Sequence, residues 1–206
     1  MRRLIAILRG LTPPESEPIG AALVDAGIDR LEVPLNSPEP LASIGRLVAA
    51  VGARADVGAG TVLTTAQVRA VAAAGARFVV APNTDAEVIR AAGAVGLEAW
   101  PGAFTASECF AAIRAGAAGL KLFPASVLGP AGIKALKAVL PADVPVYAVG
   151  GVEADDVAAY AAAGCDGFGI GSSLYAPGRA VDDVAARARA LVAAHDAVFA
   201  TAEPRR

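Results

Sequence analysis

A repeating unit of twenty-odd residues is the feature that most constrains the fold of this chain. Each unit has an alanine-rich segment, a glycine and then a short apolar segment. A glycine just past the end of a helix adopts a left-handed conformation at little cost, so each such glycine predicts a helix end. Six glycines stand at these positions: Gly27, Gly52, Gly75, Gly96, Gly116 and Gly164. The repeat therefore predicts helices that alternate with strands.

The predicted helices also have recognisable starts. A Thr followed three residues later by Glu or Gln forms a capping box, which satisfies free backbone N–H groups at a helix N-terminus. The pattern occurs at Thr12 with Glu15, Thr64 with Gln67, Thr84 with Glu87 and Thr105 with Glu108. Pro13 suits the first position of a helix. The last helix is predicted from Val181 to about Phe199.

The apolar segments between these helices predict eight strands. They are Leu4–Leu8, Arg30–Leu35, Asp56–Gly60, Arg77–Ala81, Leu97–Pro101, Gly119–Phe123, Val144–Val149 and Gly167–Gly171. Strict alternation of strands and helices indicates a parallel sheet covered by helices. Eight units predict an α/β protein with a closed (β/α)8 TIM barrel, in one domain over residues 1–206. An open doubly wound sheet is the alternative, which the lack of G-x-G-x-x-G after the first strand disfavours.

Composition and charge exclude several classes of protein. Of the 206 residues, 55% are hydrophobic and 18% are charged, which excludes intrinsic disorder. No uncharged stretch is long enough to span a membrane. The net charge of −2 and the lack of a basic stripe argue against a nucleic-acid partner. The first residues lack the pattern of a cleavable signal, so we expect a cytoplasmic protein.

The two thiols and the single imidazole are not expected to carry chemistry. Cys109 and Cys165 are isolated in the sequence and form no disulfide framework. His195 lies in the predicted C-terminal helix, far in sequence from the glycine-rich loops. We expect it on the surface or the flank of that helix. A His-based metal site or a Ser-His triad is therefore not predicted.

Two charged residues break the apolar pattern of the strands. Glu32 lies in the predicted strand Arg30–Leu35, and Lys121 lies in Gly119–Phe123. A buried ammonium without a partner costs several kcal/mol or has a lowered pKa, and only a neutral amine attacks a carbonyl. Catalysis by Lys121 is one interpretation, and a structural ion pair with Glu32 is the other. Glu98 opens its strand, at the end opposite to barrel active sites, and is predicted to be structural.

Other strand ends supply polar and glycine positions for a ligand. Arg9 follows the first strand and is suited to a bidentate carboxylate contact, with the Thr61 hydroxyl as a second contact. The alternative for Arg9 is a rim arginine paired with a loop acid. The last two strands end in Gly150-Gly151 and in Gly169–Ser173. Glycine-rich loops at these two strands of a barrel predict a phosphate site built from backbone N–H groups.

Seven segments of the chain follow one another in the order of a known family. They are Ile5–Gly10, Glu32–Pro38, Gly58–Leu63, Lys121–Pro124, Gly129-Pro130, Ile133–Pro141 and Ala148–Val152. These segments resemble the 2-keto-3-deoxy-6-phosphogluconate aldolase family of class I aldolases. The resemblance extends over nearly the whole chain, which makes it far more specific than any single motif.

The resemblance implies roles for the residues singled out above. Lys121 falls on the family's Schiff-base lysine, and Glu32 falls on its general acid/base. Arg9 and Thr61 fall on its contacts with the substrate carboxylate. The family's phosphate contacts fall on Gly150, Gly151, Gly171 and Ser172.

The activity that the resemblance implies is a reversible retro-aldol cleavage without a metal or an organic cofactor. The expected substrate is a phosphorylated keto-deoxy sugar acid, 2-dehydro-3-deoxy-6-phospho-D-galactonate, which yields pyruvate and D-glyceraldehyde 3-phosphate in galactonate catabolism. Gluconate-type members tend to carry Arg and Thr where this chain has Asn36 and Val149, so the galactonate epimer is favoured. Trp100 is expected to narrow the mouth of the site.

Several alternatives stay open at this point. Within the family, the gluconate epimer is the other candidate substrate. Outside it, the chain could be a phosphate-binding barrel isomerase that uses carboxylates or cysteine. It could also be a non-catalytic barrel that binds sugar phosphates, in which Lys121 merely neutralises Glu32. Members of the family are usually homotrimers, and the resemblance implies the same assembly here.

Overall fold

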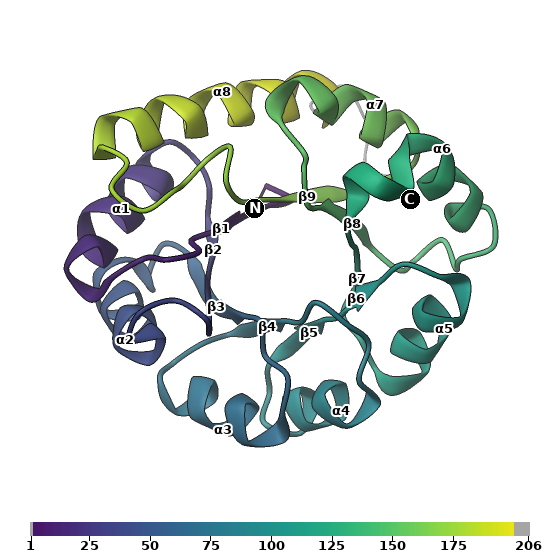
Figure 1. The fold of residues 1–206 in the computed structure, drawn as a ribbon, viewed down its shortest axis with the longest axis horizontal. Helices are drawn as coiled ribbons and strands as arrows, with labels where there is room; N and C mark the ends of the chain where they lie inside the picture. Colours follow the sequence, from purple (N-terminus) through teal and green to yellow (C-terminus); the bar gives the residue numbers. More distant parts are fainter. Residues whose placement is uncertain (1, 200–206) are drawn as a thin grey trace.

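Strands and helices alternate along the chain as the repeat predicts, and the strands form a ring inside the helices (Figure 1). The computed structural model describes residues 2–199. The strands are β1 Leu4–Ile7, β2 Arg30–Pro34, β3 Asp56–Gly60, β4 Phe78–Val80, β5 Glu98–Trp100, β6 Gly102–Ala103, β7 Leu120–Leu122, β8 Val146–Val149 and β9 Gly167–Ile170. The helices are α1 Pro13–Asp25, α2 Pro40–Val51, α3 Thr65–Ala73, α4 Ala86–Ala94, α5 Ala106–Ala115, α6 Ala125–Lys137, α7 Val157–Ala162 and α8 Val181–Phe199, with a short 3-10 helix at Ala154–Asp156.

The predicted fifth strand, Leu97–Pro101, is observed as β5, and a second short strand, β6, follows Pro101; the barrel closes between the two. β5 pairs with β4, whereas β6 pairs with β7, and every pair is parallel. The N–H of Ala118 donates to the carbonyl of Ala99 at 2.9 Å, and the N–H of Lys121 donates to the carbonyl of Pro101 at 3.0 Å. These bonds join β5 and Pro101 to the next unit. The closed (β/α)8 barrel is therefore confirmed; one domain over residues 1–206 stays a prediction, since residues 1 and 200–206 lie outside the described residues.

Most helix starts follow the predicted caps. The capping boxes at Thr12, Thr64 and Thr105 are present. The prediction at Thr84 is wrong, because Asp85 caps α4 instead and accepts from the N–H of Val88 at 3.1 Å. The Thr84 hydroxyl donates to the carbonyl of Gly102 at 2.8 Å, so it links two strand ends.

Helix ends follow the glycine rule with one exception. Left-handed φ values occur at Gly27, Gly75, Gly96, Gly116 and Gly164. Gly52 has a φ of −61° and stays in the right-handed region, so the prediction of a left-handed cap is wrong there. The chain leaves α2 through a right-handed turn, in which the N–H of Arg54 donates to the carbonyl of Val51 at 2.8 Å.

The strand side chains form two layers, one toward the helices and one inside the barrel. The inner cluster consists of Ile5, Phe78, Val80, Trp100, Tyr147 and Val149. On β3, Val57 and Ala59 belong to the outer core, so Gly58 and Gly60 face inward. The ring of Phe78 occupies the space that a Cβ on Gly58 would need, at 2.6 Å. At these two positions β3 contributes no side chain to the interior, and side chains of neighbouring strands fill the space.

Arg30 closes the N-terminal end of the barrel. Its side chain is buried, and its guanidinium lies 4.5 Å from the ring centroid of Phe78 and 5.2 Å from that of Trp100. It donates to Glu98 at 2.6 Å, and the indole N–H of Trp100 donates to the same oxygen at 3.1 Å. Burial raises the pKa of Glu98, but these hydrogen bonds outweigh it and the pKa is lowered. The structural role predicted for Glu98 is confirmed.

Trp100 lies at this closed end and not at the mouth of the barrel. Its side chain is buried, and its ring centroid is 4.6 Å from that of Tyr147. The predicted narrowing of the mouth is wrong, because the indole points toward Glu98 at the start of β5. Gly119 leaves room for the ring, since a Cβ there would come within 2.7 Å of an indole carbon.

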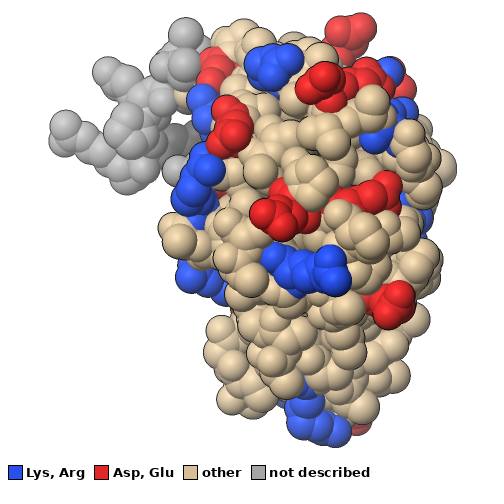
Figure 2. Space-filling view, turned by 90° about the vertical axis from the view of Figure 1, so that its left-hand side faces the viewer, with Lys and Arg blue, Asp and Glu red and all other residues tan. Residues whose placement is uncertain are grey.

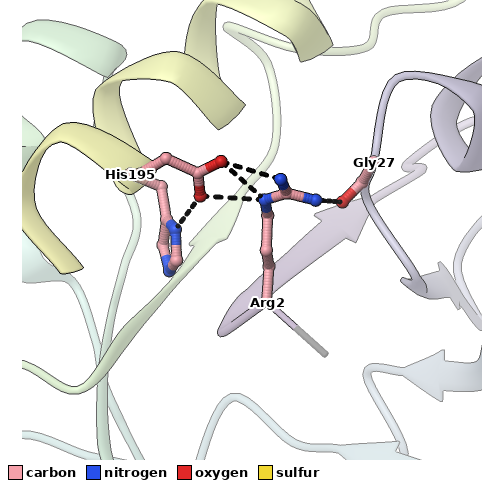
Figure 3. A network of polar contacts seen from close by, with 4 residues as sticks. Arg2, Gly27 and His195 are labelled. Atoms are coloured by element: carbon pink, nitrogen blue, oxygen red, sulfur yellow. Dashed lines mark hydrogen bonds and ion pairs between the residues drawn. The ribbon is translucent and has the colours of Figure 1, made fainter. Parts of the chain in front are cut away.

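A polar clasp ties the first residues to α8 (Figure 3). Two nitrogens of Arg2 donate to Asp196 at 2.8 and 2.7 Å, and a third donates to the carbonyl of Gly27 at 3.2 Å. His195 lies 3.0 Å from the same carboxylate and stacks on Phe199. His195 is predicted on the surface or the flank of the helix, and the surface position is wrong, because the residue is only 6% exposed. Its place in the clasp gives it a structural role.

The outer surface carries charges of both signs. Figure 2 shows Lys and Arg interspersed with Asp and Glu on the side of the barrel where α1 and α2 lie. Within residues 2–199, no helix combines the length and the apolar character needed to cross a membrane. The interspersed charges agree with the small net charge of the sequence.

Candidate active site

The predicted site residues surround one cavity at the C-terminal end of the barrel. The cavity has a volume of about 590 Å³. It is lined by all eight of the residues singled out from the sequence: Arg9, Glu32, Thr61, Lys121, Gly150, Gly151, Gly171 and Ser172. They come from six strands or from the loops that follow them, because parallel strands bring their carboxyl ends to one edge.

Lys121 is a buried amine on β7. The residue is only 8% exposed, and its Nζ lies 4.7 Å from the ring centroid of Phe123. Burial lowers the pKa of Lys121, the Glu32 carboxylate raises it in part, and the charge of Arg9 lowers it further. The net direction is downward, so the neutral amine is more accessible than in an exposed lysine.

Glu32 is a buried carboxyl group on β2. The residue is 2% exposed, and its Oε2 has no hydrogen-bond partner among the described residues. Burial raises the pKa of Glu32 to about 7, although the charges of Lys121 and Arg9 act in the opposite direction. A carboxyl group with this pKa both holds and releases a proton near neutral pH, as a general acid/base must.

The two buried charges do not form a closed ion pair. Of the salt bridges within residues 2–199, none joins Lys121 to Glu32 within 4.0 Å. They still influence each other, because each shifts the pKa of the other. The alternative of a purely structural pair therefore lacks the contact that would define it.

Arg9 is held at the rim by an amide. Its Nη1 donates to the Oδ1 of Asn36 at 2.7 Å, and both side chains line the cavity. The described residues give Arg9 no carboxylate partner within 4.0 Å, so the predicted alternative of a loop acid is wrong. An arginine whose charge is not neutralised in this way is free to bind an anion. No pattern in the sequence predicts Asn36 as the partner of Arg9.

Thr61 has an unusual backbone conformation beside the cavity. It follows β3 directly and has a φ of 57°, in the left-handed region. Such a conformation costs about 1–3 kcal/mol in a non-glycine residue and is found mostly where the surrounding structure imposes it. Thr61 lines the cavity, so the strained turn places a hydroxyl residue there.

The loop after β9 offers unpaired backbone donors. The N–H groups of Leu174 and Tyr175 both donate to the carbonyl of Gly171 at 2.9 Å, which makes a single helical turn. At the start of this turn, the N–H groups of Ser172 and Ser173 have no backbone acceptor within the described part of the chain. Free N–H groups at the start of a helical turn suit an anion.

Two arginines that were not predicted as site residues donate to carbonyl groups of this loop. Arg179 donates to the carbonyl of Ser172 at 3.1 Å, and Arg187 donates to the carbonyl of Ser173 at 3.1 Å. Both also pair with Asp183. Their spacing along α8 and the segment before it gives no pattern from which this contact could have been predicted.

The loop after β8 packs closely against the start of α6. Gly150 and Gly151 have φ values of 94° and 72°. A Cβ on Gly151 would lie 2.7 Å from the side chain of Ser126, and one on Gly150 would lie 3.0 Å from the ring of Phe123. Glycine is therefore required at both positions for conformation and for space.

Neither cysteine lines the cavity. Cys109 and Cys165 are buried and free, and burial raises their pKa to about 11 and about 12. Within residues 2–199, no group of three or more His, Cys, Asp or Glu residues could hold a metal ion. Among the residues that line the cavity, Lys121 and Glu32 are the two whose amine and carboxyl group are buried together.

Known proteins that are similar to this chain over nearly its whole length are aldolases. Residues 1–187 match the family model described as KDPG and KHG aldolase. The probable 2-dehydro-3-deoxy-6-phosphogalactonate aldolase of Rhizobium meliloti (strain 1021) is 54% identical over 198 residues, which are 96% of this chain and 93% of that one. The 2-dehydro-3-deoxy-6-phosphogalactonate aldolase of Escherichia coli (strain K12) is 50% identical over 192 residues, 93% of this chain and 94% of that one. A solved structure of native KDPGal superposes with a TM-score of 0.94 at 49% identity and covers 96% of each chain.

Proposed function

The chain belongs to the KDPG and KHG aldolase family, and on this premise we propose that it cleaves 2-dehydro-3-deoxy-6-phospho-D-galactonate to pyruvate and D-glyceraldehyde 3-phosphate in galactonate catabolism. It is an aldolase and thus a carbon–carbon lyase. The observation that carries the proposed mechanism is the buried Lys121 beside a protonatable Glu32 in one cavity. The substrate follows from the names of the two relatives.

The first half of the mechanism forms a Schiff base on Lys121. Its neutral Nζ attacks the C2 ketone and gives a carbinolamine. Glu32, as the acid, protonates the C2 hydroxyl, which leaves as water while the nitrogen lone pair forms the C=N bond. The product is an iminium, and Glu32 is now a carboxylate. A carboxyl group with a pKa of about 7 is suited to both states.

The second half breaks the carbon–carbon bond. The Glu32 carboxylate takes the proton of the C4 hydroxyl, the C3–C4 electron pair moves toward the iminium, and D-glyceraldehyde 3-phosphate leaves. Glu32 then returns this proton to C3 of the resulting enamine. Water hydrolyses the iminium, which releases pyruvate, restores the neutral amine and gives the remaining proton back to Glu32. The iminium is the electron sink, so the proposed reaction needs neither a metal nor an organic cofactor.

The two ends of the substrate bind at opposite sides of the cavity in this proposal. Arg9 and Thr61 hold the carboxylate next to the Schiff base. The phosphate binds to the backbone donors of the last two loops, at Gly150, Gly151, Gly171 and Ser172. The free N–H of Ser172 and the left-handed glycines after β8 support this assignment.

Gly171→Ala tests the phosphate site without straining the loop. Gly171 has no left-handed φ, and a Cβ there meets only the Cβ of Ile7, at 3.9 Å. The methyl group should obstruct the phosphate oxygens and raise the KM for the phosphorylated substrate about tenfold. Schiff-base formation with pyruvate, which carries no phosphate, should be unchanged. Equal effects on both ligands would place the phosphate elsewhere.

Reduction with borohydride tests the central step. The protein mixed with pyruvate should gain the mass of a reduced pyruvate adduct, and peptide mapping should place it on Lys121. The absence of an adduct would favour an isomerase or a barrel that only binds sugar phosphates. A comparison of kcat/KM for the galactonate and gluconate epimers then tests the substrate. Asn36 and Val149 favour the galactonate epimer, so its kcat/KM should be the higher of the two.

A cytoplasmic homotrimer is the form in which we expect the enzyme to work. The family resemblance is what supports the trimer. Light scattering of the purified protein measures the assembly directly. A monomeric mass at micromolar concentration would contradict the trimer.

A further inference from the structure

We infer that Gly60 is a positioning residue, because the missing side chain at the end of β3 creates the space in which the Glu32 carboxylate lies. This inference rests on the acid/base role proposed for Glu32. β2 and β3 pair in parallel, with Glu32 opposite Gly58 and Pro34 opposite Gly60. The Glu32 side chain therefore leans along its strand direction toward the next inward-facing position of β3, which is Gly60.

The contact involves the whole carboxyl group. A Cβ on Gly60 would overlap Oε2 of Glu32, and it would lie 2.5 Å from Cδ and 2.7 Å from Oε1. Cβ atoms in folded proteins essentially never approach another heavy atom within 3.0 Å. The carboxylate and a side chain at position 60 therefore cannot occupy their places together.

Conformational freedom does not explain this glycine. Gly60 is in a strand and is not among the described glycines with a left-handed φ. Its carbonyl accepts from the N–H of Leu35 at 2.8 Å, which fixes the backbone against β2. Alanine would fit this backbone, so the carboxylate is what excludes it.

The same contact accounts for the burial of the carboxyl group. The Oε2 of Glu32 is buried without a hydrogen-bond partner in the described part of the chain, and it lies against the methylene of Gly60. A methyl group there would push the carboxyl group toward the cavity or toward Lys121. In either place, water or the ammonium would stabilise its charged form.

Gly58 provides a matched control on the same strand and the same inward face. A Cβ there would lie 2.6 Å from atoms of the Phe78 ring and would not touch the carboxylate. Gly58→Ala therefore disturbs packing inside the barrel, whereas Gly60→Ala disturbs the position of the acid. The two variants make the same chemical change two residues apart.

The test compares the titration and the kinetics of the two variants. In Gly60→Ala, the Glu32 carboxyl group, followed by carbon NMR in protein with labelled glutamate and without substrate, should titrate at least one pH unit lower. The kcat of the Gly60→Ala variant should fall about tenfold or more. Gly58→Ala should lower the Tm and leave the titration of Glu32 unchanged. An unshifted titration in Gly60→Ala, or the same shift in both variants, would overturn the inference.

A stability cycle covers the case in which Gly60→Ala folds poorly. In the Glu32→Ala background no carboxyl group is present, so adding Gly60→Ala should cost much less Tm than it costs in the wild type. An equal loss in both backgrounds would overturn the inference. The titration and the stability cycle need no substrate, so a failure of the proposed aldolase reaction would appear separately, as a wild-type protein without a borohydride adduct.

Discussion

The two ends of the barrel each hold a buried cation beside a glutamate, but only one of these pairs is closed. At the N-terminal end, Arg30 donates to Glu98 at 2.6 Å, and Trp100 donates to the same oxygen. At the C-terminal end, Lys121 and Glu32 share a cavity without a salt bridge within the described residues. The pKa of Glu98 is lowered, whereas the pKa of Glu32 is raised to about 7.

The difference shows what separates a structural charge from a reactive one. Both cations also lie near aromatic rings, at 4.5 Å for Arg30 over Phe78 and 4.7 Å for Lys121 over Phe123, so aromatic contact does not distinguish them. Hydrogen bonds to the carboxylate do. Where donors reach the carboxylate, they hold it charged. Where they do not, burial raises the pKa of the acid and lowers the pKa of the amine.

The largest effect is expected at the amine. Lys121→Ala removes the nucleophile, and turnover should fall by about 10⁵-fold or more. Borohydride should trap no pyruvate adduct in this variant. Circular dichroism and Tm serve as controls for folding. More than a trace of aldolase activity in the folded variant would remove Lys121 from the mechanism.

The acid at the same end should give the next effect. Glu32→Gln keeps the shape of the side chain and removes the proton transfer, which typically costs about 10²–10⁴-fold in rate. Binding of pyruvate should persist. Exchange of the pyruvate methyl protons with deuterium, followed by proton NMR, measures the step directly. Exchange at nearly the wild-type rate would assign the acid/base role to another group.

The sequence predicts the charged residues at the two ends of the barrel, but not the partner of each charge. Glu32 and Lys121 stand out because a strand covered on both sides should be apolar. Glu98 could be assigned to the opposite end from its place at the start of a strand. The partner of each charge depends on side-chain direction across the barrel, which strand spacing does not specify. Trp100 illustrates this: it lies next to Pro101 in the sequence, yet its indole extends toward Glu98.

Other features depended on contacts between segments far apart in the chain. Gly60 belongs to a recognised motif, but its reason, the carboxylate of Glu32, lies on another strand. His195 is buried because α8 packs against Arg2 at the other end of the described chain. The separate strand β6 after Pro101 follows from the pairing of β5 and β6 with different neighbours. Periodicity contains none of this information.

The closed pair should respond to mutation in stability and not in rate. Arg30→Met removes a buried cation, its hydrogen bond to Glu98 and its contacts with two aromatic rings, which should cost about 3–4 kcal/mol of unfolding free energy. The half-exposed Glu98 can then be solvated, which limits the loss. Denaturant unfolding measures the loss. The kcat of the folded fraction should stay within about twofold of wild type; a fall as large as that of Glu32→Gln would make the two ends functionally equivalent.

The smallest effect is a pH dependence of stability with opposite signs at the two ends. The pKa of Glu32 is raised to about 7 in the folded state, so the folded protein binds more protons than the unfolded chain between about pH 4.5 and 7. Stability from this group therefore falls as the pH rises through that window, by roughly 3 kcal/mol, and stays constant above it. The lowered pKa of Glu98 acts in the other direction, with stability present above its unfolded pKa and lost as the pH falls.

Glu32→Gln should therefore gain stability over the wild type as the pH rises from 4.5 to 8. Glu98→Gln should be less stable than the wild type at pH 8 and should approach it in acid. Urea unfolding at both pH values measures the two differences. A constant gap between Glu32→Gln and the wild type would mean that the acid titrates alike in both states, and the distinction between the open and the closed pair would fail.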